Sequence, residues 1–217
     1  MPKGQYLTRI TPGRHSSVVT RTHIQFIRHG QTDWNNDNRY QGTSDIPLNA
    51  TGQEQAATLA AAMHGESWDR MISSPLSRAF ETATAVARAI GIDEADIIPD
   101  KRAMERSYGD AEGLTIPERE AIWPGGNWPN LEPWENVARR GMEMLNDLVR
   151  DFPGERIIVV AHGGLINALL ATISHGEVGT GKTILLNTSR TDLFHDHDGW
   201  TIGMVGDVSH LEDSVIA

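Results

Sequence analysis

Two arginines and two histidines follow apolar stretches of the chain at points where a strand is expected to give way to a turn. Arg28 and His29 come directly after one such stretch, Arg78 follows a second, and His162 ends a third. In open α/β sheets, ligands bind beyond the carboxyl ends of the strands. A guanidinium holds phosphate oxygens in a bidentate manner, and an imidazole acts as a base or nucleophile near neutral pH. This set of residues therefore indicates a site for phosphoryl chemistry.

Each of these signals is weak alone, because a histidine at the end of a strand is more often a structural residue. The order of the motifs is more specific. Arg-His-Gly-x-Thr-x-x-Asn spans 28–35, Ser-Pro-Leu-x-Arg-Ala spans 74–79, an acidic segment with two glycines spans 105–113, and His-Gly-Gly spans 162–164. Separated motifs that agree in order and spacing are a far stronger signal than any one of them.

In these motifs the chain resembles the histidine phosphatase superfamily, also called the phosphoglycerate-mutase-like family, from about residue 23 to residue 210. The resemblance implies a single-domain three-layer α/β/α sandwich with a mostly parallel central sheet. It also implies hydrolysis of a phosphomonoester through a phosphohistidine. In that mechanism His29 attacks phosphorus, and Glu105 protonates the leaving oxygen before it activates water.

The same resemblance assigns catalytic roles to Arg28, Arg78 and His162. An oxygen-binding histidine such as His162 would be most useful in its protonated form. The residues expected to bind phosphate or substrate are Arg28, Asn35, Gln41, Gly42, Arg78, Tyr108, His162 and Gly163.

Some of these assignments have competitors on chemistry alone. Asp110 and Glu112 could serve as the proton donor, and only the family pattern favours Glu105. Arg78 could instead form an ion pair with Glu81 on the same expected helix. A phosphate-binding role is favoured because the segment around Arg78 repeats the strand-turn-helix arrangement of the first motif.

The length of 217 residues and the hydrophobic content of 39% suit one α/β domain, which we place at residues 23–217. Residues 1–22 are rich in Ser, Thr and Arg and contain no acidic residue. We interpret them as an N-terminal arm or leader, and a transit peptide is the alternative.

The formal net charge of −10 disfavours nucleic acid as a partner, because a phosphate backbone needs a basic surface. The absence of cysteine excludes disulfides and Cys-based zinc sites. No apolar run approaches the length of a membrane span, and no signal-peptide core follows Met1. We therefore expect a soluble cytoplasmic protein that binds a small-molecule phosphate monoester and needs no cofactor or metal. A homodimer is left open.

Helix and strand patterns alternate along the chain. A capping box of Thr51 and Glu54 is expected to begin a helix that ends at Gly65. Ser74 as N-cap, with Pro75 at the first helical position, is expected to begin the next. Further helices are expected at 134–151 and 165–174, and further strands at 157–161 and 183–186.

Two segments resemble sites of other protein classes. Residues 176–183 match the phosphate-binding loop of nucleotide hydrolases, but an expected helix precedes them and an expected strand follows, which is the wrong context. Lys182 could still touch a substrate. The cluster His195, Asp196, His197 and Asp198 resembles a metal site, but a polar hairpin turn explains it without metal.

Two other functions stay open. A cofactor-dependent phosphoglycerate mutase shares every catalytic motif, although mutases of this family carry a longer, more basic insertion where residues 113–131 contain only Arg119 as a base. A non-catalytic interaction module on the same fold is the alternative from another class. The complete set of catalytic residue types argues against it.

Overall fold

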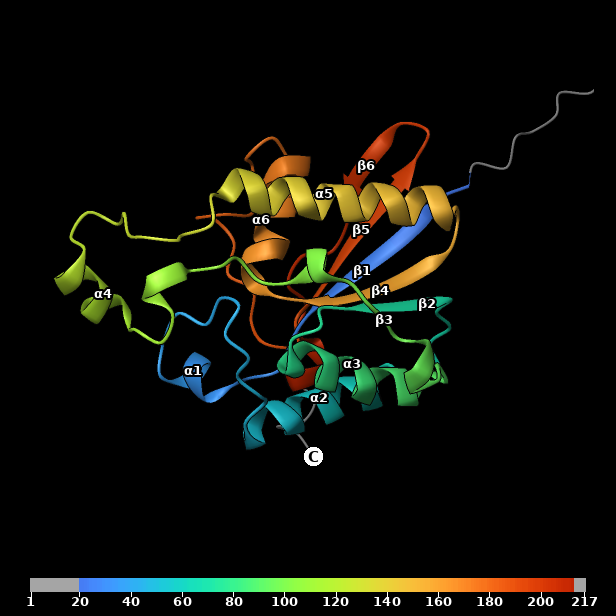
Figure 1. Cartoon of the computed structure of the whole chain (residues 1–217). Coiled ribbons are helices and arrows are strands. Elements are labelled where there is room, and N and C mark those ends of the chain that lie inside the picture. The colour runs from blue at the N-terminus through green and yellow to red at the C-terminus, as the bar shows by residue number, and fades with distance from the viewer. Residues whose placement is uncertain (1–19, 213–217) are drawn as a thin grey trace, which may run out of the picture.

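A six-stranded sheet runs through the centre of residues 20–212, the part of the chain that the computed structural model describes (Figure 1). The strand order is β3-β2-β4-β1-β5-β6, and the first four of these strands are parallel. The proposed arm at 1–22 lies almost wholly outside the described residues. The strands are β1 (Thr22–Arg28), β2 (Arg70–Ser73), β3 (Ile98–Pro99), β4 (Arg156–Ala161), β5 (Arg190–Asp196) and β6 (Gly199–Ile202).

Strand β1 lies in the middle of the sheet and carries the first motif at its carboxyl end. It pairs in parallel with β4, where Phe26 faces Val159, and antiparallel with β5, where Phe26 faces Thr191. The predicted mostly parallel sheet is therefore confirmed, with β5 as its antiparallel member. Because β1, β2 and β4 are parallel, their carboxyl ends meet at one edge.

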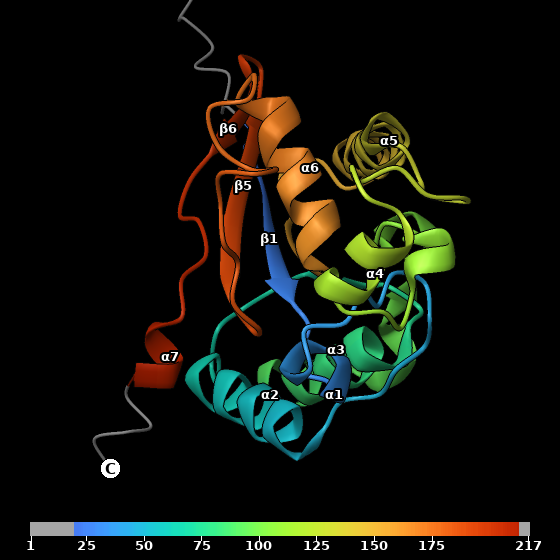
Figure 2. The ribbon, with the colours of Figure 1, turned by 90° about the vertical axis from the view of Figure 1, so that its left-hand side faces the viewer.

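Helices cover both faces of the sheet, which gives the predicted three layers (Figures 1 and 2). Helices α2 and α3 cover one face, and α5 and α6 cover the other. Shorter helices lie near the ends of the strands. The helices are α1 (Asp33–Asn36), α2 (Ala50–Ala62), α3 (Ser77–Ile90), α4 (Ile116–Ile122), α5 (Trp134–Asp151), α6 (Gly163–Ile173) and α7 (Ser209–Glu212), with 3₁₀ turns at Glu94–Asp96, Lys101–Ala103 and Gly109–Ala111.

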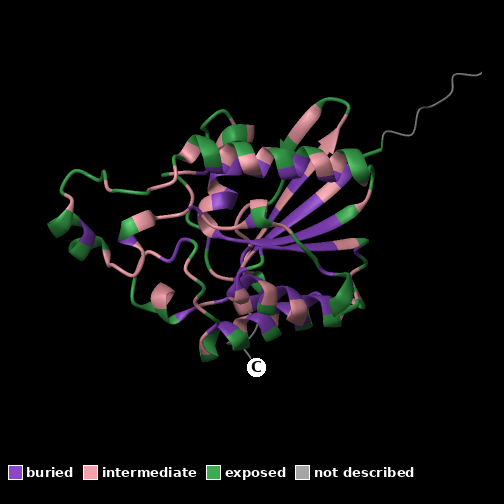
Figure 3. Ribbon diagram, viewed as in Figure 1, coloured by how far each residue is buried: buried purple, intermediate pink, exposed green. Residues whose placement is uncertain are grey.

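Strand β4 explains how one sheet supports two cores. Ile157 and Val159 belong to the cluster under α5 and α6, whereas Ile158 and Val160 belong to the cluster under α2 and α3. Successive strand residues point to opposite faces, so a strand that is covered on both sides is apolar throughout. Figure 3 shows this burial along the central strands. Among the described residues, no helix is both long and apolar enough to span a membrane.

Two helix starts differ from the prediction. Helix α2 begins at Ala50, and the Asn49 side chain accepts a hydrogen bond from the Gly52 amide, so the expected Thr51–Glu54 capping box is wrong. Helix α3 begins at Ser77. Ser74 does not cap it, since Leu76 is the N-cap residue and no side chain among the described residues caps the helix. The Ser74 hydroxyl instead accepts from Leu76 N at 3.3 Å and lies 2.8 Å from His162 Nε2. The local sequence pattern could not show that Asn49, rather than Thr51, caps α2. It also could not show that Ser74 contacts a distant histidine instead of capping α3.

The strand expected at 183–186 is absent. Main-chain oxygens of this segment accept hydrogen bonds from side chains instead of from a neighbouring strand. Asn167 Nδ2 donates to Thr183 O at 3.3 Å, and the Arg28 guanidinium donates to Leu185 O. The apolar pattern of the segment was therefore misleading, since Ile184 is 87% exposed.

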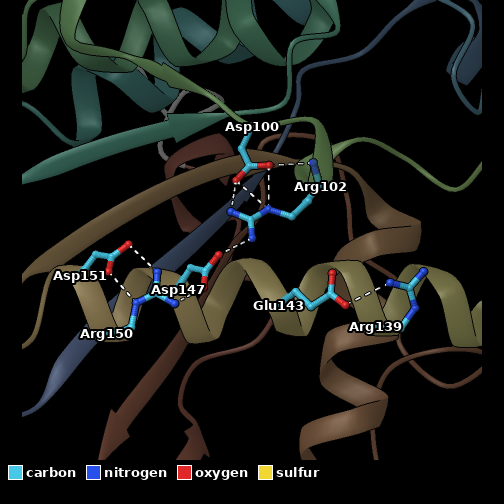
Figure 4. A network of polar contacts seen from close by, with 7 residues as sticks. All are labelled: Asp100, Arg102, Arg139, Glu143, Asp147, Arg150 and Asp151. Atoms are coloured by element: carbon cyan, nitrogen blue, oxygen red, sulfur yellow. Dashed lines mark hydrogen bonds and ion pairs between the residues drawn. The ribbon is translucent and has the colours of Figure 1, made fainter.

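A network of ion pairs ties the segment before Glu105 to helix α5 (Figure 4). The Arg102 guanidinium contacts Asp100 at 2.7 Å and Asp147 of α5 at 2.6 Å. Arg150 contacts Asp147 and Asp151 on the same helix. A single ion pair at the surface contributes little free energy. The pair between Arg102 and Asp147 nevertheless joins two elements, and it holds the start of the segment 100–105 against helix α5.

Candidate active site

A cavity of about 310 Å³ opens at the carboxyl ends of β1, β2 and β4. It contains most of the residues that the sequence motifs singled out. Its lining residues are Arg28, His29, Asn35, Arg39, Tyr40, Gln41, Gly42, Arg78, Glu105, Tyr108, Gly163, Gly164, Asn167, Thr183, Ile184 and Leu185.

Main-chain oxygens hold the two predicted arginines. Arg78 is fully buried and donates to Gly42 O and Ser44 O, each at 2.9 Å, so the alternative pairing with Glu81 is not observed. Burial lowers the pKa of Arg78 to about 10, which still leaves it charged at neutral pH. Because carbonyl groups do not neutralise a guanidinium, both arginines keep their positive charge available to an anion in the cavity.

His29 is buried, and its ring Nδ1 lies 2.6 Å from Gly30 O. Since a carbonyl oxygen only accepts, Nδ1 carries the proton and Nε2 carries a lone pair. Burial and the positive charges of Arg78 and Arg28 lower the pKa of His29 well below its ordinary value. The imidazole is therefore neutral at physiological pH, with Nε2 available as a nucleophile.

His162 lies beside His29, with 5.0 Å between the ring centroids. It directly follows β4 and is the N-cap residue of α6. Its Nε2 lies 2.8 Å from Ser74 Oγ, and its Nδ1 is buried without a hydrogen-bond partner among the described residues. Burial and the cation Arg78 lower its pKa well below the ordinary value, so the expected protonated form is not supported.

Glu105 meets the amino end of α6, where main-chain N–H groups have no partner within the helix. Its carboxylate accepts from Gly164 N at 2.9 Å, from Leu165 N at 3.2 Å and from Arg106 N at 2.7 Å. The Arg140 guanidinium binds the main-chain oxygens of Met104 and Glu105. Helix α6 thus binds the Glu105 carboxylate directly, and Arg140 of helix α5 holds the main chain beside it.

The two competing acids have other partners. Glu112 accepts from the main-chain N–H groups of Thr43, Ser44 and Tyr108. It therefore supports the loop whose oxygens hold Arg78. Asp110 accepts from the Asn130 side chain at 2.8 Å. Neither acid lines the cavity, whereas Glu105 does.

Asn35 and Gln41 are joined through the buried Thr32. Asn35 Oδ1 accepts from Thr32 N at 3.1 Å and from Asn187 Nδ2 at 3.3 Å. Gln41 Oε1 accepts from Thr32 Oγ1 at 2.9 Å. Because both side-chain oxygens are engaged, their amide nitrogens are the groups left to donate.

The backbone at Gly42 requires glycine. Its φ is +55°, and a Cβ there would lie 2.0 Å from Glu112 Oε1. The close approach keeps Gly42 O in place for Arg78.

Known proteins with similar sequences and structures belong to the family that the motifs resemble. The profile of the histidine phosphatase superfamily (branch 1) matches residues 24–208. The chain belongs to this superfamily. It is 36% identical to the uncharacterized phosphatase PhoE of Bacillus subtilis (strain 168), over 88% of this chain and 97% of that protein. It is also 32% identical to the probable phosphoglycerate mutase GpmB of Cronobacter sakazakii (strain ATCC BAA-894), over 87% and 94% of the two chains.

A solved structure shows the same fold. The mycobacterial glucosyl-3-phosphoglycerate phosphatase in complex with VO3 superimposes with a TM-score of 0.76 at 30% identity, covering 86% of this chain and 99% of that one. Members of the superfamily with phosphatase names and with mutase names therefore both resemble this chain.

Several lining residues were not among the site residues expected from the sequence. Asn167 lies one helical turn beyond Gly163 on α6, so its spacing from the His-Gly-Gly motif could have indicated it. Thr183, Ile184 and Leu185 were hidden because their segment was interpreted as a strand. The residues missed are Arg39, Tyr40, Gly164, Asn167, Thr183, Ile184 and Leu185.

Of the two segments that resemble other kinds of site, only Thr183, at the end of 176–183, lines the cavity. Lys182 donates to Gly176 O within its own turn and does not line the cavity. The segment 176–183 follows α6 and opens no helix, so its rejection as a nucleotide loop is confirmed. The expected polar hairpin is also confirmed, since Asp196 pairs with Gly199 at the end of β5 and β6.

Proposed function

We propose that this chain is a phosphatase that hydrolyses small phosphate monoesters through a phosphohistidine on His29. The observation that carries the proposal is the ring of His29, which is neutral and tied at Nδ1 to Gly30 O. It lines the same cavity as the cations Arg28 and Arg78. A neutral imidazole between two arginines is a nucleophile next to a binding site for a dianion.

In the first step, the Nε2 lone pair attacks phosphorus in line with the leaving oxygen. The N–P bond forms while the bond from phosphorus to the ester oxygen breaks. Glu105, which is protonated while the phosphate dianion is bound beside it, gives its proton to that oxygen. In the second step, Glu105 removes a proton from water as the water attacks phosphorus. The N–P bond then breaks, inorganic phosphate leaves, and both His29 and Glu105 return to their starting forms.

Unused donors around the cavity support the placement of the phosphoryl group. Arg28 Nε, Arg78 Nε and His162 Nδ1 are buried and have no partner among the described residues. If Ser74 gives its hydroxyl proton to His162 Nε2, the ring proton lies on Nδ1, and a neutral His162 still donates a hydrogen bond. These donors, with the Asn35 amide, suit the equatorial oxygens of a transferring phosphoryl group.

We propose that the reaction needs no metal ion. The charge of a transferring phosphoryl group lies on its equatorial oxygens, and Arg28 and Arg78 supply the positive charge that a magnesium ion supplies in other phosphoryl-transfer enzymes.

The region 113–131 favours a phosphatase over a mutase. Arg119, its only base, is buried on α4 with its guanidinium 4.9 Å from the Trp128 ring centroid. Arg119 does not line the cavity. Arg39 does line it, but its guanidinium pairs with Glu118 at 3.4 Å. A mutase must retain a bisphosphorylated intermediate, which needs additional positive charge at the site. Comparing phosphate release with isomerisation of 3-phosphoglycerate tests this choice, and fast isomerisation without release would overturn it.

A non-catalytic module is the less supported function. Such a module would bind vanadate, which mimics the five-coordinate phosphoryl group, yet leave every phosphate monoester intact. Arg28, His29 and Glu105 all line one cavity here, which is unexpected for a module that performs no chemistry.

The other side chains in the cavity wall favour a polar metabolite as substrate. Tyr40, Tyr108, Asn167 and Ile184 line the cavity with the phosphate-binding residues, so the wall offers aromatic faces, an amide and one exposed aliphatic side chain. A panel of sugar phosphates, phosphoglycerates, nucleotides and aryl phosphates tests this. With a net charge of −10, the proposed partner is a small phosphate ester rather than nucleic acid. A cytoplasmic location belongs to the same proposal.

A further inference from the structure

A tight turn at 187–188 holds the backbone of the proposed nucleophile. Thr188 N donates to Arg28 O at 2.9 Å and approaches His29 O at 3.4 Å. Asn187 Nδ2 donates to His29 O at 2.9 Å. On the opposite side, His29 N donates to Ala161 O of β4 at 3.0 Å. The position of the His29 backbone therefore depends on this turn as well as on the sheet.

The turn contains a strained residue. Thr188 has φ +59° and is fully buried. A β-branched residue in the left-handed region is an outlier, and strain of this kind persists only when the surroundings hold it in place. The strained residue is thus the one whose amide donates to Arg28 O.

One distant side chain reaches Thr188. The Thr188 hydroxyl donates to Asn187 O at 2.7 Å, and its oxygen lies 3.0 Å from His210 Nε2. Because the hydroxyl has only one proton and has given it to Asn187, His210 Nε2 must be the donor in the second contact. His210 is 5% exposed, and its Nδ1 has no hydrogen-bond partner among the described residues.

The protonation state of His210 agrees with this direction of donation. Burial and Arg190 lower its pKa, against the opposing effect of Asp207. A neutral ring has one proton, and that proton is used on Nε2. The residue lies on α7, beside α2 (Figure 2), and beyond the segment 24–208 that matches the superfamily.

We infer that His210 is a positioning residue for His29, which it supports by holding Thr188 in its left-handed conformation. The inference rests on the proposed function. It assigns a role in the reaction to helix α7, a part of the chain outside the superfamily match.

The test is a double-mutant comparison of kcat and KM with p-nitrophenyl phosphate. We expect His210→Leu to lower kcat roughly tenfold with little change in KM, the size of effect that loss of one buried hydrogen bond can have. His210→Gln keeps an N–H donor and should recover most of the loss. Glycine adopts φ +59° without strain. In a Thr188→Gly background, His210→Leu should therefore cost less than about twofold.

An equal loss from His210→Leu in both backgrounds would mean that His210 only packs α7 against the domain, which overturns the inference. A His210→Gln variant as slow as His210→Leu would also overturn it. Thermal unfolding followed by circular dichroism sets an assay temperature at which every variant is folded. If His210→Leu does not fold, Thr188→Val removes the hydroxyl while leaving His210 in place, and it should show the same loss of kcat.

Failure of the proposed function is visible separately. A wild-type chain that releases no phosphate contradicts the phosphatase proposal whatever the variants do. In that case the ¹⁵N resonances of the His29 ring still test the positioning role. We expect Nδ1 protonated in the wild type and a mixture of tautomers in His210→Leu, and an unchanged spectrum would contradict the role.

Discussion

Glu105 and Gly164 contact each other so closely that any side chain at position 164 would displace the Glu105 carboxylate. Glu105 Oε2 accepts from Gly164 N at 2.9 Å, and a Cβ at 164 would lie 2.3 Å from Glu105 Oε1. The amino end of α6 therefore defines where the proposed proton donor can lie.

Gly164→Ala should displace the Glu105 carboxylate and lower kcat on the order of 10²-fold, because a displacement of about 1 Å has effects of this size. Gly163→Ala is the matched comparison, since a Cβ there meets Arg28 Nε at an ordinary 3.5 Å and should cost much less. Steady-state kinetics on a monoester measures both. Equal losses would show that Glu105 placement is not what matters.

Arg78→Lys should lower kcat/KM on the order of 10²-fold, because an ammonium group cannot reproduce a fork held by two carbonyl oxygens while presenting charge to phosphate. The control is Arg88→Lys on the same helix, whose exposed side chain pairs with Glu94. Retention of wild-type kcat/KM by Arg78→Lys would contradict the bidentate role.

The two histidines should differ in a rapid-quench experiment with ³²P-labelled substrate. We expect the wild type to trap a phosphoryl group that is acid-labile and alkali-stable, and His29→Ala to abolish it. His162→Ala should slow the labelling severely without preventing it, because it removes stabilisation of the transition state but not the attacking atom. Label that persists in His29→Ala and vanishes in His162→Ala would exchange the two roles.

The free energy of unfolding should fall as the pH drops below about 6.5. His29 and His162 have folded-state pKa values well below the ordinary 6.5, so in this range the unfolded chain binds more protons than the folded one. Each histidine then contributes a loss of up to about 1.4 kcal/mol per pH unit until its folded-state pKa is reached.

Urea unfolding of the wild type and of a His29→Asn, His162→Asn double variant at pH 7 and 5.5 measures this effect. The double variant should lose less free energy on acidification, and the exposed His197→Asn variant should behave like the wild type. An identical pH dependence in all three chains would show that the two buried histidines are not responsible.

Activity should survive a chelator such as EDTA and should be blocked by vanadate. Both expectations follow from a site whose positive charge comes from Arg28 and Arg78 and whose ligand is a five-coordinate phosphoryl group in the transition state. Restoration of a chelated enzyme only by added magnesium or zinc would contradict the proposal.

The sequence predicted those parts of the site that come directly from strand ends. Arg28 ends the buried apolar strand β1, His29 follows it, and His162 follows β4. Parallel strands bring their carboxyl ends together whatever lies between them. Glu105 was separable from Asp110 and Glu112 only through the family pattern. Its position depends on the amino end of α6, a contact 59 residues away that no local signal contains.

Other features depended on long-range contacts and were therefore missed. The segment 183–186 has the composition of a strand, yet the side chains of Arg28 and Asn167 take its carbonyl groups. Ser74 had the right residue type for a helix cap, but its hydroxyl contacts His162 from another strand. In each case a distant partner competed with the local preference.

The central place of β1 also has a consequence for how the chain folds during synthesis. In the part of the chain that the structure describes, the first strand, Thr22–Arg28, pairs only with strands that begin at Arg156 and Arg190. More than a hundred residues must leave the ribosome before either edge of β1 is covered. Loops of this length make the pairing slow and leave an apolar strand uncovered in the meantime. The nascent chain is thus most prone to aggregation after His29 has been synthesised and before the sheet around it has formed. Phosphatase activity should begin only after β5 has left the ribosome.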